Sequence, residues 1–316
     1  MDETRKNYQL KFEGNGGDYF GILIVNWLLT LVTLGIYYPW ARAKRIKYTY
    51  GVMSIDDNHF SFSGNGKEMF IGLLKLVLFV VVAYALFMSL VFLNFPAIAI
   101  ILLYVALIGI IPLAVHGSMR YRLSRTTLRG IRFGYRGSRA TLVKEYTKML
   151  LLTLVTLGVY GSWMQMKLNS YMIGNVRYGE VEGRFQGKGS EFFMITLKGS
   201  LLTLITLGIY SFWWQKDMFA YQLSKTSFHK GEQEIRFKST MTGGGLFKLQ
   251  IVNILLTIFT FGIAYAWVEM RTKKFYTDHV KIAGNIDLAS LTQTEEEYKN
   301  AFGEDAVDFF DINLFF

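Results

Sequence analysis

The chain contains no cysteine among its 316 residues. Disulfides, thiolate nucleophiles and cysteine-based metal sites are therefore excluded. The sequence also gives no indication of the redox compartment. Charge is also scarce, since 18% of the residues are charged, against about 25% in an average soluble domain. Hydrophobic residues make up 52%, aromatic residues 16%, and the mean hydropathy is +0.27. This composition indicates a protein surrounded by lipid, with aromatic rings at the membrane interfaces.

Recognisable catalytic motifs are missing as well. The four histidines form no His-x-x-x-His pair, and no Gly-x-Ser-x-Gly elbow, aspartate dyad or metal-ligand spacing occurs. The glycine-rich turns at 14–17, 187–189 and 243–245 lack the Lys-Ser/Thr of a phosphate-binding loop, so tight strand-to-helix turns explain them better. We therefore expect no enzyme, no cofactor and no metal. A catalytic site assembled from distant helices is the alternative.

The charges are distributed unevenly along the chain. The net charge is +10, although residues 287–316 carry eight acids and one lysine. Basic residues cluster beside apolar runs, a pattern typical of membrane topology and of contact with anionic headgroups rather than nucleic acid. We expect the lipid bilayer as a partner. The tail sequences Asp308-Phe309-Phe310-Asp311 and Phe315-Phe316 can form a partner peptide, but we favour a solvated, poorly ordered end.

Six stretches approach the roughly 20 apolar residues that a transmembrane helix needs. They are Tyr19–Tyr38, Met69–Asn94, Ala97–His116, Met149–Met166, Phe192–Trp214 and Leu249–Val268. The first would act as an uncleaved signal anchor, because no cleavable signal precedes it. If all six span the membrane, loops 41–68, 117–148 and 215–248 carry 20 Lys and Arg, and the other side carries 12. The richer side is expected in the cytoplasm, with both termini outside it.

Four segments align without gaps when they are placed on Gly14, Gly137, Gly187 and Met241. Threonine recurs 16 and 19 residues later, glycine 21 later and tryptophan 26 later. These columns contain Thr30, Thr153, Thr203 and Thr257; Thr33, Thr156, Thr206 and Thr260; Gly35, Gly158, Gly208 and Gly262; and Trp40, Trp163, Trp213 and Trp267. A degenerate copy starts at Gly64, with an apolar hairpin in place of the signature. Such columns predict internal repeats.

We therefore expect an all-α integral membrane protein, a polytopic helical bundle of about five ~50-residue repeats with small β-hairpins between the helices. One such hairpin is expected around Asp56-Asp57-Asn58. The membrane domain would cover 1–286 and an acidic C-terminal tail 287–316. The predicted units are 8–58, 59–131 with an extra helical hairpin, 132–181, 182–235 and 236–286.

The number of spanning helices is left open by these units. A unit with one spanning helix must invert relative to its neighbour, which puts identical turns on both faces of the membrane. Alternatively, each helix bends at its glycine and returns as a re-entrant element, which is allowed where the backbone is buried in protein or lines water.

The recurring motif resembles a known family. The runs Thr-Leu-Val-Thr-Leu-Gly-Ile-Tyr from Thr30 and Thr-Leu-Ile-Thr-Leu-Gly-Ile-Tyr from Thr203 are similar to the YjgN-like family, which is defined by a domain of unknown function. The resemblance covers about Tyr8 to Gly284 and is specific because the motif recurs in register. It implies a multi-pass protein of the bacterial inner (cytoplasmic) membrane with a polytopic helical body. It implies no activity and no catalytic residues.

Polar residues within the apolar runs are the candidates for function. Each threonine pair shares one helix face and can line a solute path, but we favour packing and hydrogen bonds back to the same helix. Lys75, Lys148 and Lys198 each lie 11 residues after the glycine that starts their unit. They are either charged sites within the membrane or side chains that snorkel to the headgroups, and both readings stay open. Asn26 and Asn253 are expected to hydrogen-bond between helices.

The four signature glycines are expected to permit close helix packing with a slight bend, rather than a positive-φ turn. Two classes of function follow from these features. The first is a transporter or channel for a small solute, although the absence of acids inside the spans argues against the usual proton coupling. The alternative is a structural or regulatory membrane protein that binds lipid or a protein partner. The oligomeric state is left open.

Overall fold

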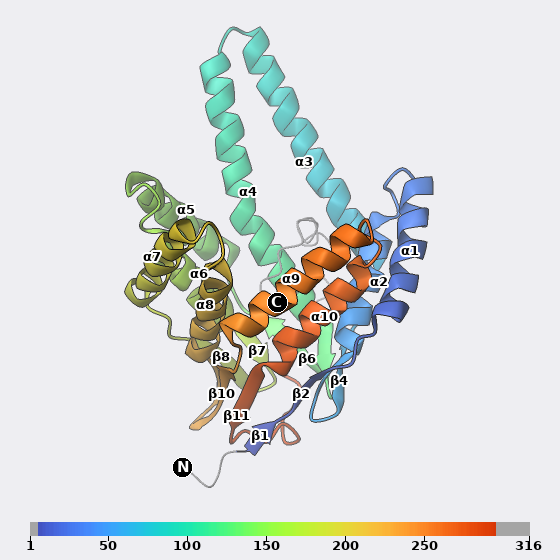
Figure 1. Cartoon of the computed structure of the whole chain (residues 1–316). Coiled ribbons are helices and arrows are strands. Elements are labelled where there is room, and N and C mark those ends of the chain that lie inside the picture. Colours follow the sequence, from blue (N-terminus) through green and yellow to red (C-terminus); the bar gives the residue numbers. More distant parts are fainter. Residues whose placement is uncertain (1–5, 295–316) are drawn as a thin grey trace.

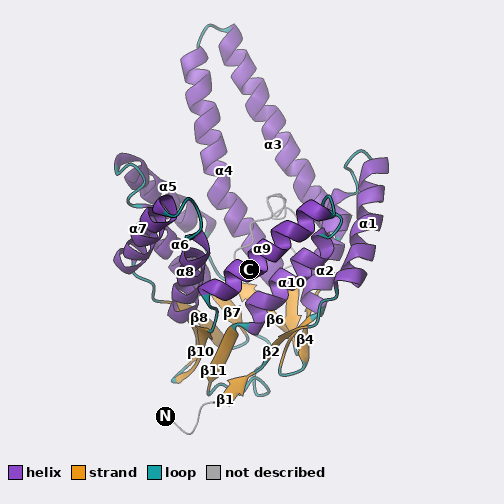
Figure 2. Ribbon diagram, viewed as in Figure 1, coloured by secondary structure: helices purple, strands orange, loops and turns teal. Residues whose placement is uncertain are grey.

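The computed structural model describes residues 6–294, which contain ten helices and eleven strands. The helices are α1 (Gly16–Val32), α2 (Tyr38–Gly51), α3 (Gly66–Phe92), α4 (Pro96–Ser124), α5 (Arg139–Val155), α6 (Gly161–Gly174), α7 (Gly189–Ile205), α8 (Ser211–Lys225), α9 (Gly243–Phe259) and α10 (Tyr265–Asp278). The strands are β1 (Lys6–Tyr8), β2 (Leu10–Phe12), β3 (Met53–Ile55), β4 (Asn58–Phe62), β5 (Thr126–Leu128), β6 (Ile131–Tyr135), β7 (Val176–Tyr178), β8 (Val181–Phe185), β9 (Thr226–Lys230), β10 (Gln233–Ser239) and β11 (Val280–Gly284). The helices and the strands form two separate layers (Figure 2).

All the strands join one antiparallel sheet in the order β1-β11-β10-β9-β8-β7-β6-β5-β4-β3-β2. At one end Lys6 of β1 lies opposite Gly284, and at the other Leu10 of β2 lies opposite Ile55. Because only Gln9 separates β1 from β2, one short segment supplies both ends of the sheet. The sheet therefore curls into a nearly closed barrel, which we call the strand ring.

The prediction of an all-α helical bundle of repeats is therefore wrong. The short hairpins do lie between the helices, as expected, but each one also pairs with its neighbours, as β4 does with β5 and β8 with β9. Unpaired strand edges expose backbone donors and acceptors, and pairing between neighbouring hairpins satisfies them on the inner strands. The unit boundaries proposed from the sequence stay a prediction.

Local sequence accounts for the ends of many elements. Asp56 (φ 47°) and Asp57 (φ 62°) form the tight turn between β3 and β4, as the hairpin prediction required. Positive φ at both central residues matches the right-handed twist of the strands and favours Asp, Asn or Gly. Asn15, Asn65 and Ser138 cap α1, α3 and α5 by accepting hydrogen bonds from backbone N–H groups in the first turn.

Consecutive helices pair as five antiparallel hairpins. The α3–α4 hairpin extends far beyond the others (Figure 1). Within residues 6–294, α3 and α4 alone are long and apolar enough to cross a membrane. Their most apolar 18-residue windows have mean hydropathies of 2.6 and 2.9, and only 11% and 17% of these windows is buried. The predicted spans Met69–Asn94 and Ala97–His116 correspond to these two helices.

The six-span topology is wrong for the other four apolar runs. Each of them contains the end of one helix, a reversal at the signature glycine and the start of a second helix. The α1–α2 hairpin begins after β2 and ends before β3, and these two strands are hydrogen-bonded neighbours. A hairpin that leaves and returns to the same sheet does not separate its ends across a bilayer. The hairpins have the chain reversal that the re-entrant alternative requires.

Residues 285–294 cover one end of the strand ring, and we call them the plug. Ile286, Leu288 and Leu291 are buried with side chains of β1, β5, β7, β8, β10 and β11. The backbone N–H of Arg132 donates to Gln293 Oε1 (2.6 Å), and the Thr294 hydroxyl donates to the Gly179 carbonyl (2.7 Å). Residues 287–294, which begin the predicted acidic tail, therefore pack against the strand ring. The Phe-containing sequences at 308–316 lie outside the described residues.

Candidate functional site: the hairpin tips

Four short hairpins, α1–α2, α5–α6, α7–α8 and α9–α10, end in a large apolar residue that touches almost nothing. These tip residues are Leu34, Leu157, Leu207 and Phe261, with exposed fractions of 93%, 95%, 93% and 95%. The last residues of the preceding helices are also exposed, at 74% to 81%. A soluble protein scatters single exposed apolar residues, but four matching tips form a repeated feature that needs an explanation.

The backbone of each tip follows one pattern. Each tip residue has a φ of 49° or 50°, and the glycine after it has a φ between 85° and 95°. In the first hairpin the Gly35 N–H donates to the Thr30 carbonyl (2.7 Å) and the Leu34 N–H to Leu31 (3.1 Å). These two bonds form a Schellman motif, which terminates a helix and usually has Gly or Asn at the left-handed position. Here that position has Leu or Phe, at a cost of about 1 kcal/mol or more per tip.

The prediction of close packing at the signature glycines is wrong. A side-chain carbon added at Gly35, Gly158, Gly208 or Gly262 would meet no atom within 4 Å. No neighbouring helix approaches these glycines. They are needed because a positive φ is strained for residues with a side chain, so the reversal depends on backbone freedom.

The second threonine of each pair completes the backbone hydrogen bonds of the tip. The Thr33 hydroxyl donates to the Leu29 carbonyl (2.7 Å) and accepts from the Tyr37 N–H (3.0 Å). The hydroxyls of Thr156, Thr206 and Thr260 make the same two bonds, at 2.6–3.0 Å. Each hydroxyl therefore joins the end of one helix to the beginning of the next. In lipid such groups must be satisfied within the protein, because no water is there to replace the bond.

The first threonine mostly bonds within its own helix. The hydroxyls of Thr30, Thr153 and Thr257 donate to the carbonyl four residues earlier at 2.7–2.8 Å. The buried Thr203 hydroxyl has no hydrogen-bond partner. This arrangement supports the local explanation of the threonines over a solute path. Asn26 bonds from α1 to Ala41 of α2 (3.2 Å), and Asn253 bonds from α9 to Thr272 of α10 (2.9 Å), which confirms their interhelical role.

Each signature tryptophan packs on the first turn of the next hairpin. A Cβ added at Gly66 would clash with the Trp40 ring, and one added at Gly16 would clash with Trp267. Trp163 and Trp213 meet Gly189 and Gly243 in the same way. The contact of Trp267 with Gly16 joins the last helix to the first. The glycine-rich turns thus serve packing, and the helical hairpins close into a circle as the strands do.

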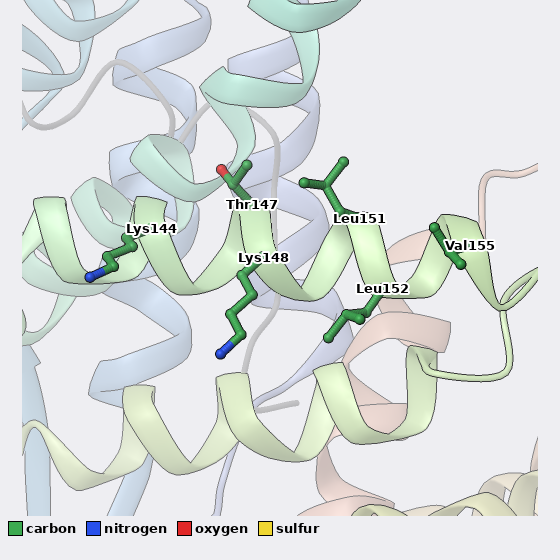
Figure 3. Close-up of a pocket in the computed structure, with 6 residues that line it drawn as sticks. All are labelled: Lys144, Thr147, Lys148, Leu151, Leu152 and Val155. Atoms are coloured by element: carbon green, nitrogen blue, oxygen red, sulfur yellow. The ribbon is translucent and has the colours of Figure 1, made fainter.

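The three predicted lysines lie on exposed helix faces. Lys75, Lys148 and Lys198 occur at corresponding positions on α3, α5 and α7. Lys148 also lines an open groove of about 630 Å³ along α5, together with Lys144, Thr147, Leu151, Leu152 and Val155 (Figure 3). Exposed lysines with apolar residues on the same face fit the snorkelling explanation.

Charged contacts between the helix ends that lie near the strand ring are not evident from the sequence. Arg125 at the end of α4 donates to Glu68 near the start of α3 (2.7 Å), and both side chains are nearly buried. Lys225 at the end of α8 makes the corresponding contact with Glu191 of α7 (2.9 Å), and this bond lowers the pKa of the Glu191 carboxyl. Acids that follow the glycine-rich turns indicate helix N-termini in the sequence. The basic partners of Glu191 and Glu68, however, lie 34 and 57 residues away in sequence.

Two of the histidines make hydrogen bonds to backbone carbonyls. His116 donates from Nε2 to the Gly137 carbonyl (2.9 Å), and His279 from Nδ1 to the Phe275 carbonyl (2.7 Å). Among residues 6–294 no three His, Asp or Glu side chains gather in a way that would hold a metal ion. The site that the structure brings together is therefore the set of four apolar tips.

The sequence of the chain is similar to those of bacterial inner membrane proteins. A family model described as a bacterial protein of unknown function (DUF898) matches residues 7–185, 180–232 and 214–309. The inner membrane protein YjgN of Salmonella typhimurium (strain LT2) is 25% identical over 373 residues, covering 93% of each chain. The proteins of the same name from Escherichia coli O157:H7 and K12 are 36% and 35% identical over 129 residues, which is 41% of this chain and 31% of theirs. No solved structure matches.

Proposed function

The chain belongs to the YjgN-like (DUF898) family of bacterial proteins, and we propose that it is a structural, lipid-binding protein of the inner membrane. In this proposal α3–α4 spans the bilayer, and the four short hairpins insert into the leaflet next to the strand ring. The inner-membrane names of its relatives support the location. The observation that carries the proposal is the set of four tips, each with an exposed Leu or Phe in a strained conformation.

Helix lengths support the depth of insertion. Helix α1 opens the first short hairpin and has 17 residues, and α3 opens the long hairpin and has 27 residues. Both helices start beside the strand ring. At 1.5 Å per residue they are about 25 and 40 Å long, and the hydrocarbon core is about 30 Å thick. If the α3–α4 tip reaches the far boundary, the short tips end about 15 Å earlier, near the midplane.

Charge supports the orientation. Residues 76–115, which form the outer part of the α3–α4 hairpin, contain no Asp, Glu, Lys or Arg. In the described part of the chain, every Lys and Arg therefore lies toward the strand ring. The positive-inside bias then favours a cytoplasmic strand ring.

A transporter has less support from this geometry. Buried side chains such as Tyr8, Leu128 and Tyr178 fill the strand ring, and the plug covers it. These described residues leave the ring without a solvent-filled centre. A wedge in one leaflet has a different consequence: it enlarges that leaflet relative to the other, so membrane binding becomes sensitive to curvature.

Topology can be tested by single cysteines in this cysteine-free chain. Asn94→Cys at the α3–α4 tip should react with an impermeant maleimide in intact cells. Cysteines at Asp57 and Arg184, both exposed on the strand ring, should react only after permeabilisation. The six-span topology predicts that Arg184→Cys reacts in intact cells while Asp57→Cys does not. That result would refute the proposal.

The wedge role can be tested by reconstitution into vesicles. Increasing the protein-to-lipid ratio should reduce the vesicle diameter seen by electron microscopy. Replacing all four tip residues by serine should weaken this effect, since burial of each large apolar side chain contributes about 1.5–3 kcal/mol. If the tip variant remains inserted and reduces the diameter as the natural chain does, the tips do not act as wedges.

A further inference from the structure

The face of α5 that lines the open groove changes from basic to apolar along its length. Its residues are Lys144, Thr147, Lys148, Leu151, Leu152 and Val155. Their spacing of three and four places them on one side of the helix, while Leu142 and Met149 are buried on another. In Figure 3 the two lysines lie toward one end of the groove and Val155 toward the other. We call this face the α5 stripe.

Resting on the proposed insertion of the hairpins, we propose that the α5 stripe is a binding site for an anionic phospholipid of the near leaflet. Both lysines are exposed, and within residues 6–294 neither makes an ion pair. Their ammonium groups are thus available to a phosphate group. The exposed Leu151 and Val155 (58% and 81%) offer an apolar surface to an acyl chain.

The length of the stripe fits one leaflet. Lys144 lies 11 residues before Val155, a distance of about 16 Å along the helix at 1.5 Å per residue. Half of the hydrocarbon core is about 15 Å. When the tip is at the midplane, Lys144 therefore lies at the headgroup level, and Lys148 reaches the same level by snorkelling.

The corresponding faces of α7 and α1 differ in charge from the α5 stripe. On α7 the positions of Lys144 and Lys148 are occupied by Met194 and Lys198. On α1 they are occupied by Gly21 and Val25, so that stripe has no lysine. The apolar half is alike in all three, with an exposed leucine at the position of Leu151. The chain thus contains stripes with two, one and no lysines.

This series gives an internal control. A fluorophore on Leu151→Cys, Leu201→Cys or Leu28→Cys labels the same position of each stripe, which is 58%, 51% or 48% exposed. The full-length protein is reconstituted with brominated phosphatidylglycerol or brominated phosphatidylcholine, and quenching gives the relative affinity for the two lipids. The preference for phosphatidylglycerol should increase about fivefold with each lysine, from α1 to α7 to α5, since a lysine near an anionic surface contributes about 1 kcal/mol.

Two double variants test the lysines directly. Lys144→Gln with Lys148→Gln should abolish the preference at α5. Lys238→Gln with Lys281→Gln removes the same charge from exposed neighbours on β10 and β11 and should leave it unchanged. Equal preference at the three stripes, or a preference that persists in the α5 variant, overturns the site. Quenching by neither lipid instead refutes the insertion on which this inference rests.

Discussion

Replacing Gly208 by alanine, valine or leucine should destabilise the protein by nearly the same amount each time. Gly208 has a φ of 95°, and an added Cβ meets no atom within 4 Å. The cost is therefore set by the backbone conformation and not by side-chain volume. A left-handed conformation costs a residue with a side chain about 1–2 kcal/mol. We expect a loss of about 2 kcal/mol for all three variants, because this φ lies beyond the left-handed helical well.

Two other glycines provide matched controls. Gly21 lies within α1 and has open space around it, so Gly21→Ala should stabilise the protein by up to about 1 kcal/mol through helix propensity. Gly199 lies against the Trp214 ring, where an added Cβ would clash. Substitutions there should become more damaging from alanine to leucine.

The measurement is reversible unfolding in detergent, followed by circular dichroism at several denaturant concentrations. A nearly flat series at Gly208 beside a steep series at Gly199 supports the positive-φ explanation. If alanine at 208 is tolerated and valine and leucine become progressively worse, a neighbouring helix must contact this glycine, and the hairpin geometry described here is wrong.

Two further perturbations test the packing of the hairpins and the plug. Trp213→Ala removes a ring packed on the first turn of α9 and should reduce the free energy of unfolding by about 3–5 kcal/mol. Trp27→Ala, on an exposed face of α1, should change it little. Equal losses would refute the packing role of Trp213. Thr292 donates to Glu180 and holds the pKa of that carboxyl at about 2. The stability that this bond contributes is therefore fully present above about pH 4.5 and is lost as the pH falls toward 2. Glu180→Gln should therefore speed hydrogen exchange in the plug at neutral pH, the difference should vanish near pH 2, and Glu232→Gln in an exposed turn should have no effect.

Local features could be predicted from sequence because short-range chemistry sets them. The aspartates at 56 and 57 favour the left-handed turn between β3 and β4, and the prediction of a hairpin there is confirmed. The pair of apolar helices around Phe95-Pro96 is likewise evident from length and hydropathy alone. The recurring threonines and glycines coincide with the hairpin tips.

The direction of the chain at the tips was not readable in the same way. Leu34 and Ile36 continue the apolar pattern on both sides of Gly35. The pattern therefore predicts a helix that continues through the turn. Hydropathy reports which residues avoid water and says nothing of φ. The reversal becomes visible only where the backbone angles and the hydroxyl of Thr33 are known together.

Closure of the strand ring depended entirely on tertiary structure. Its strands are only three to seven residues long, and β1 finds its partner β11 more than 270 residues away. No local pattern encodes such a pairing. It forms because the circle of helical hairpins, joined by Trp267 on Gly16, brings the two ends of the chain together and leaves their backbone groups in need of partners. Composition and periodicity indicated the lipid environment and the individual helices and hairpins. Their closure into a ring depends on tertiary packing.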